Sequence, residues 1–274
     1  MSLNIFNLKE KLRSIILLKI PDLYWKIKAR SQSNNLENKY IFKYSKQFSI
    51  DKSFIEFGFS LIEFNCVQIA KKGFKGLLID ANSNTCDLAN NIFRRLGLKV
   101  NALNYWLKVD SLEPILEFIK NNKNKLGVLS IDIDGVDYWI LKEIYKHIKP
   151  EIIVVEYNAS FGLKPISVPY DENFERMTYH KSGWYHGASF TAFQKLLEDE
   201  YILKENIDGL NLIFIRKDKF QNIKTNNFPI VTYKEQKVRN IISKLNASRQ
   251  WEFIKNLEFE EVELKNKRIK FKKN

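Results

Sequence analysis

The chain has 274 residues, of which 45% are hydrophobic, so it is long enough for one sizeable domain with appendages. Its two cysteines exclude a disulfide framework, and its three histidines argue against a metal cage built from histidine. The net charge of +13 comes from the two ends of the chain. Residues 1–52 carry 11 Lys and Arg against 4 Asp and Glu, and residues 219–274 carry 14 against 6. Residues 53–218 are nearly neutral, with 20 Lys and Arg against 22 Asp and Glu. A near-neutral centre argues against a nucleic-acid-binding core.

These shifts in charge predict three parts: a basic helical N-terminal extension (1–52), a core domain (53–218) and a basic, mainly helical C-terminal extension (219–274). Residues 3–20 alternate apolar and charged positions at helical spacing and stop at Pro21. Such a helix either packs on a domain or a partner, or lies on an anionic membrane surface. Every apolar run is shorter than the roughly 20 residues that span a bilayer, and no signal peptide is recognised. We expect a cytoplasmic protein whose basic flanks could touch the inner face of the membrane, and oligomerisation is left open.

The core alternates predicted strands and helices. Strands are predicted at 54–59, 76–80, 100–107, 128–131 and 152–155, and helices at 62–72, 84–96, 111–121, 138–148 and 188–199. Residues 201–207 and 210–215, separated by Asp208-Gly209, predict an antiparallel hairpin. Residues 31–38 are predicted as a loop, and 233–246 and the Glu- and Lys-rich end as helices. This order predicts an α/β fold with a doubly wound, Rossmann-like sheet and a terminal antiparallel hairpin.

Polar residues stand where the predicted strands end. Asp132 and Asp134 follow one buried strand, and Glu156 and Asn158 follow the next. Since open α/β sheets bind ligands at the carboxyl ends of their strands, these four residues are the active-site candidate. The alternative is structural: Asp134-Gly135 forms a turn and Asp137 caps the following helix.

Two further acids occupy informative positions. Glu56 lies in the first strand just before Gly58, and Asp80 ends the second strand. An acid at the second position suits hydrogen bonds to ribose hydroxyls. The alternative is that a strand end near the surface simply carries an acid.

The ordered segments FIEFG, GLLIDAN, LSIDIDGVDYW, VVEYNASFG, VPYD, GWYHGASFTAF and LNLIFIRKD carry a family resemblance. Residues 54–218 resemble class I S-adenosylmethionine-dependent methyltransferases, in particular the FkbM-like bacterial group associated with glycans. The resemblance implies that S-adenosylmethionine is the cofactor and that Asp132 lies beside its methyl group. The cofactor-binding residues it implies are Glu56, Gly58, Ser60, Asp80, Ala81 and Asp132. One departure is the turn after the first strand, where Phe59-Ser60-Leu61-Ile62 replaces the usual glycines.

Methyl transfer to a hydroxyl at neutral pH needs a base or a metal that lowers the hydroxyl pKa. Asp134, Glu156 and Asn158 offer oxygen ligands for Mg²⁺ or Mn²⁺, and the arrangement resembles metal-dependent sugar O-methyltransferases. Asp132, Asp134 and His186 are the predicted catalytic residues. His186 and His180 are the alternative bases, unless they are packed loop histidines. The predicted function is an O-methyltransferase for a small polar acceptor, such as a sugar or phosphorylated precursor of a cell-surface polysaccharide or capsule. The alternative is a catalytically lapsed domain that serves as a binding or scaffold protein.

Overall fold

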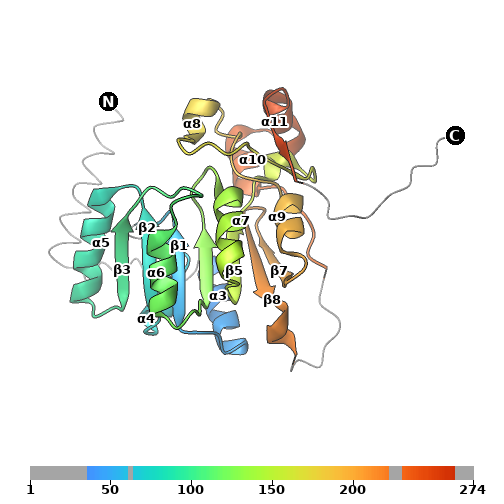
Figure 1. Ribbon diagram of the computed structural model, residues 1–274. Helices are drawn as coiled ribbons and strands as arrows, with labels where there is room; N and C mark the ends of the chain where they lie inside the picture. The colour runs from blue at the N-terminus through green and yellow to red at the C-terminus, as the bar shows by residue number, and fades with distance from the viewer. Residues whose placement is uncertain (1–35, 61–63, 222–229, 263–274) are drawn as a thin grey trace. The chain divides into compact units, whose positions relative to one another are not determined.

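The chain folds around a mostly parallel seven-stranded sheet with helices beside it, as the computed structural model in Figure 1 shows. The structure describes residues 36–60, 64–221 and 230–262. The strand order is β3-β2-β1-β4-β5-β8-β7, and β7 and β8 run antiparallel. The predicted α/β class with a doubly wound sheet and a terminal hairpin is therefore confirmed. The chain divides into unit 1, up to Ile133 plus Ile144–Val154, and unit 2, Asp134–Glu143 plus the chain from Val155 onward.

Unit 1 is built on four parallel strands. They are β1 Ser53–Phe57, β2 Lys75–Asp80, β3 Val100–Asn104 and β4 Val128–Ile131. All residues of β1 and β4 are buried, because strands inside a parallel sheet are covered on both faces, and this explains their nearly continuous apolar sequences. Phe57, the last residue of β1, is paired with Ile79 on β2 and Ile131 on β4. The carboxyl ends of these three strands therefore lie at one edge.

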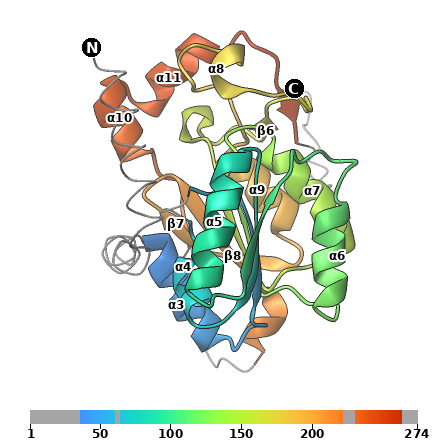
Figure 2. The same cartoon turned by 90° about the vertical axis from the view of Figure 1, so that its left-hand side faces the viewer.

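Helices cover both faces of these four strands. Seen nearly along the sheet in Figure 2, α3 (Leu36–Gln47), α4 (Val67–Lys71) and α5 (Ser83–Arg95) lie on one face and α6 (Glu113–Asn121) on the other. Helix α5 shows why the sequence breaks where it does. The side chain of Asn82 accepts a hydrogen bond from the Thr85 amide at 3.1 Å, which caps the first turn, and Gly97 with a φ of +65° follows the last one.

Two elements pass from one unit to the other: α7 (Asp137–His147) and β5 (Ile152–Glu156). The rest of unit 2 begins with the short helix η1 (Ala159–Phe161) and continues with β6 (Ile166–Ser167), α8 (Arg176–Tyr179), α9 (Phe190–Leu197), β7 (Tyr201–Ile207), β8 (Asn211–Arg216), η2 (Lys217–Phe220), α10 (Lys237–Ser243), α11 (Ala247–Ile254) and β9 (Glu260–Glu261). The predicted turn is present, since Asp208 and Gly209 both have positive φ.

Several predictions of secondary structure were wrong in detail. The strand predicted at 100–107 ends at Asn104. Leu36–Asn38, predicted as part of a loop, begins α3, whose Ile41 and Tyr44 are buried. The predicted helix at 233–246 is shorter, and a break at Lys244, which has a φ of +58°, separates α10 from α11. Glu260–Glu261 forms a strand paired with β6 rather than a helix. The predicted helix at 3–20 lies outside the described residues. Among the helices of the described ranges, none combines the length and apolar character needed to cross a bilayer.

Candidate functional site

Three strands of unit 1 end at the residues predicted to contact a cofactor. Gly58 and Ser60 follow β1, Asp80 and Ala81 stand at the end of β2, and Asp132 follows β4. Ser60 and Ala81 are exposed, and Asp80 and Asp132 are half-buried. The fold thus brings these predicted residues to one edge of the sheet.

Asp80 is held firmly while part of its carboxylate stays open. Its Oδ1 accepts a hydrogen bond from the Asn82 amide at 2.8 Å, and its backbone carbonyl accepts from the Tyr105 amide at 3.0 Å. No residue in the described ranges donates a hydrogen bond to its Oδ2. This oxygen can therefore accept a hydrogen bond from a ligand hydroxyl, as the prediction of a ribose contact requires.

Gly58 is explained by close packing between β1 and β4. It has a φ of +70°, and a Cβ atom there would lie 1.6 Å from the Asp132 carbonyl oxygen. Its amide donates to the Ile79 carbonyl at 3.1 Å. Only glycine fits this position, because it alone accepts this backbone conformation without steric cost and leaves room for the neighbouring carbonyl.

Glu56 is buried and binds the backbone just before α4. One carboxylate oxygen accepts from the Asn65 amide at 2.5 Å and the other from the Cys66 amide at 2.9 Å, just before α4 begins. Burial raises the pKa of Glu56 to about 7, the charge of Asp132 adds to this, and the two amide hydrogen bonds oppose it. The resemblance placed Glu56 against the cofactor. In the structure both of its oxygens bind backbone amides, so its observed role is to hold Asn65 and Cys66 just before α4.

Unit 2 contains a pocket of about 400 Å³ at the end of β5. Glu156, Arg176, Trp184 and Arg239 line its polar and aromatic wall. The aliphatic side chains of Val238 and Ile242 line it as well. Glu156 is the only carboxylate among the lining residues, and several of these residues come from the C-terminal extension, which the sequence had left without a role.

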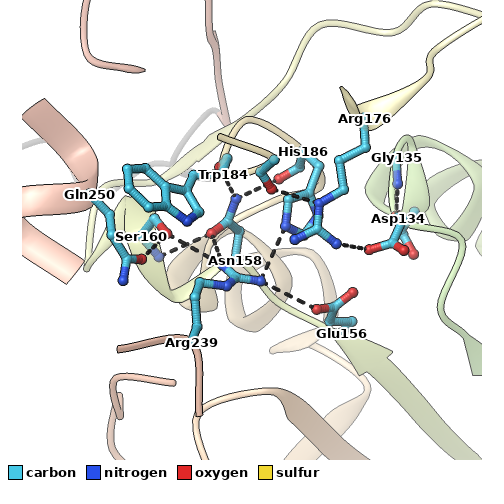
Figure 3. A network of polar contacts seen from close by, with 12 residues as sticks. Asp134, Gly135, Glu156, Asn158, Ser160, Arg176, Trp184, His186, Arg239 and Gln250 are labelled. Atoms are coloured by element: carbon cyan, nitrogen blue, oxygen red, sulfur yellow. Dashed lines mark hydrogen bonds and ion pairs between the residues drawn. The ribbon is translucent and has the colours of Figure 1, made fainter. Parts of the chain in front are cut away.

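Arg239 is the centre of the polar network beside this pocket (Figure 3). Its side chain is 9% exposed. Nη1 donates to Asn158 Oδ1 at 2.9 Å and to Ser160 Oγ at 3.3 Å. Nη2 lies 3.3 Å from His186 Nε2 and 3.7 Å from Glu156 Oε1. Burial lowers the pKa of Arg239, and the neighbouring Glu156 carboxylate opposes this, so the guanidinium remains charged.

His186 is a buried, neutral acceptor in this network. A guanidinium can only donate, so His186 Nε2 must accept the hydrogen bond from Arg239 and the ring proton sits on Nδ1. Burial lowers the pKa of His186 well below its usual value, and the charges of Arg176 and Arg239 lower it further. With its acceptor nitrogen engaged and its side chain 2% exposed, His186 is a poor base for a substrate, contrary to its predicted role.

Asn158 is not available as the metal ligand that the sequence predicted. Its Oδ1 accepts from the Ser160 amide at 3.0 Å and from Arg239. Its Nδ2 donates to the carbonyls of Trp184 at 2.6 Å and His186 at 2.9 Å. All the hydrogen-bonding capacity of the amide is used, so its role is to tie the end of β5 to two other segments of unit 2.

Asp134, Glu156 and His186 each offer one ligand atom within 4.8 Å of the others, which at first suggests a metal site. Arg176, however, forms an ion pair with Asp134, and Arg239 contacts both Glu156 and His186. Each potential ligand therefore already faces a guanidinium. Asp134 also has a φ of +55° and lies in a bend of the chain. In this arrangement the residues do not fit a divalent ion.

Sequence reasoning missed Arg239, the residue that organises the site. It lies 81 positions after Asn158, in a segment that carries no recognisable motif. Its basic surroundings indicated a solvated flank. The signal that could have found it is weak: an arginine beside apolar residues, in a short helix between two longer basic stretches.

No family model matches the sequence, and no curated protein matches it either. Among solved structures, an S-adenosylmethionine-dependent methyltransferase from Clostridium acetobutylicum is 12% identical, covers 72% of this chain and 98% of its own, and has a TM-score of 0.43. The geranyl diphosphate C-methyltransferase from Streptomyces coelicolor was solved with Mg²⁺, geranyl diphosphate and S-adenosyl-L-homocysteine. It is 11% identical, and the match covers 68% of this chain and 67% of its own, with a TM-score of 0.43. A TehB-like methyltransferase from Corynebacterium glutamicum is 12% identical, and the match covers 73% of this chain and 98% of its own, with a TM-score of 0.40. The fold class assigned above rests on this chain's own strand order, which defines a Rossmann-like α/β protein.

Proposed function

We propose that the protein is an S-adenosylmethionine-dependent methyltransferase that methylates a hydroxyl group of a small polar acceptor. The observation that carries the proposal is Asp80, which presents an open carboxylate oxygen at the end of β2 while β1 turns away at Gly58. An acid at this position of a Rossmann-like sheet suits a nucleoside cofactor, because its oxygens accept hydrogen bonds from ribose hydroxyls.

The cofactor would supply a methyl group already activated by a positively charged sulfur. The chain must then hold the acceptor and take the proton from its hydroxyl. Glu156 is the residue to which we assign acceptance of the proton, since it lines the pocket whereas His186 does not. By the resemblance, Asp132 would lie beside the methyl group.

The acceptor we favour is a sugar or a phosphorylated precursor of a cell-surface glycan. The pocket supports a polar acceptor, because a carboxylate and two guanidinium groups can pair with several hydroxyl or phosphate oxygens. The indole of Trp184 offers a flat surface for a sugar ring. We expect turnover without a divalent ion, since Glu156 in the pocket and Asp134 in the adjoining cluster each face an arginine.

Titration of the purified protein with S-adenosylhomocysteine, followed by calorimetry, tests the cofactor. Asp80→Asn should weaken binding by about tenfold to a hundredfold, because the neutral amide is a weaker acceptor for ribose hydroxyls yet still accepts from the Asn82 amide. Asp87→Asn, at an exposed position on α5, is the matched control and should bind like the wild type. Absence of binding to the wild type would refute the proposal.

A second candidate function is a binding or scaffold protein that has lost catalysis. The observation in its favour is the turn after β1, where Ser60-Leu61-Ile62 stands in place of the glycines expected by resemblance. Bulky side chains there restrict the close approach of a ligand to the backbone. The same titration separates the two functions, since the scaffold needs no cofactor.

A further inference from the structure

The C-terminal extension forms hydrogen bonds with each of the four residues that follow β5. Tyr157 Oη donates to the Lys234 carbonyl at 2.6 Å, and Arg239 binds Asn158. The Ala159 carbonyl accepts from Tyr233 Oη at 2.8 Å, and Ser160 Oγ donates to Gln250 Oε1 at 2.6 Å. Four consecutive residues after Glu156 are thus fixed by side chains or carbonyls from residues 233–250. The extension is part of the site rather than an appendage to it.

Within this arrangement Arg239 contacts the two groups that a metal would otherwise hold. Its Nη2 lies between Glu156 Oε1 and His186 Nε2, and both contacts are buried. The opposite side of the cluster is held by Arg176, which pairs with Asp134 and donates from Nε to the Gly183 carbonyl at 2.6 Å. Guanidinium groups therefore approach the cluster from two elements, α8 and α10.

The charges of the cluster balance without a metal. Asp134 and Glu156 contribute two negative charges, Arg176 and Arg239 contribute two positive charges, and His186 is neutral. A divalent ion among them would leave a net charge of about +2 in a largely buried place, which is unfavourable because charges interact strongly there. Removal of one arginine would instead leave a net negative cluster with three ligand atoms close together.

We propose that Arg239 is a positioning residue that takes the place of a divalent cation, so that the C-terminal extension completes a metal-free site at the end of β5. Its guanidinium holds Glu156 and His186 in place, as a bound ion would hold its ligands. The positioning role rests on the proposed function, whereas the exclusion of metal does not.

Titration of the full-length protein with Mn²⁺, followed by the electron paramagnetic resonance signal of the free ion, tests this. Wild type and Arg239→Lys should show no site, because both keep a cation beside Glu156. Arg239→Met, which keeps the length of the side chain and removes the charge, should bind Mn²⁺ at least about tenfold more tightly than the wild type. Glu156→Gln added to Arg239→Met should remove that binding, which would show that the ion sits in this cluster.

A second measurement separates positioning from a general effect on folding. Guanidinium chloride at tens of millimolar, far below denaturing concentrations, should displace Mn²⁺ from Arg239→Met, whereas sodium chloride at equal ionic strength should not. Stoichiometric binding of Mn²⁺ to the wild type that Glu156→Gln abolishes would overturn the proposal. So would an Arg239→Met protein with native circular dichroism that takes up no Mn²⁺. S-adenosylhomocysteine titrated into the same samples reports on the proposed function separately, because Asp80 belongs to unit 1 and Arg239 to unit 2.

Discussion

At the scale of single residues, Glu56 shows how a buried acid links loop geometry to pH. Its folded-state pKa is about 7, raised by burial from an ordinary value of 4.5. Below 4.5 the group is protonated whether the chain is folded or unfolded. Between 4.5 and about 7 the folded state keeps a proton that the unfolded state has lost, so the free energy of unfolding falls as pH rises, by up to about 1.4 kcal/mol per unit.

Glu56→Gln should remove this dependence, because the amide does not titrate. Its stability relative to the wild type should therefore improve as pH rises through this window, even though it loses one of the two amide hydrogen bonds and is less stable at the acid end. Urea unfolding at several pH values measures the difference. Glu117→Gln, at an exposed position of α6, is the control and should run parallel to the wild type. If the free energy of unfolding of Glu56→Gln also changed with pH in parallel with that of the wild type, the prediction would be contradicted.

At the scale of elements, the junction of β1 with β4 depends on Gly58. Gly58→Ala should destabilise the protein by several kcal/mol, because it adds a clash with the Asp132 carbonyl to the cost of a positive φ. Gly97→Ala is the matched control: it also has a positive φ, +65°, but no atom lies within 4 Å of the added Cβ. The free energy of unfolding of Gly97→Ala should fall by only about 1 kcal/mol. Equal losses for the two variants, measured by urea unfolding, would show that the contact with β4 contributes nothing.

The elements also show how far sequence reasoning reaches. The strands of unit 1 were predictable because burial on both faces requires apolar runs, and Asp80 and Asp132 were predictable because they directly follow such runs. The start of helix α3 was predicted as a loop because Glu37 and Asn38 are polar, yet both are buried, and Asn38 Nδ2 donates to the Phe64 carbonyl, 26 residues away in the sequence. The roles of Asn158 and His186 depend on Arg239, which approaches them from more than fifty residues away. No local pattern encodes such a contact.

At the scale of the whole molecule, the placement of charge leads to a prediction about membranes. The chain carries a net charge of +13, and both flanks are basic while residues 53–218 are nearly neutral. We expect the full-length protein to float with vesicles that contain anionic phosphatidylglycerol and to stay behind with neutral vesicles, because Lys and Arg side chains are attracted to a negative surface. High salt should abolish flotation, since it screens such attraction.

Lys9, Lys11 and Arg13 belong to the amphipathic pattern of residues 3–20, and their replacement by glutamine in one variant tests which flank is responsible. At about 1 kcal/mol for each charge near the surface, the triple variant should bind anionic vesicles about a hundredfold more weakly. Lys265→Gln with Lys267→Gln and Arg268→Gln removes the same charge from the other end and serves as the matched control. An equal loss of vesicle binding for both variants would mean that membrane contact depends on net charge alone. Flotation of the wild-type protein with neutral vesicles would mean that burial of apolar side chains, rather than charge, drives membrane binding.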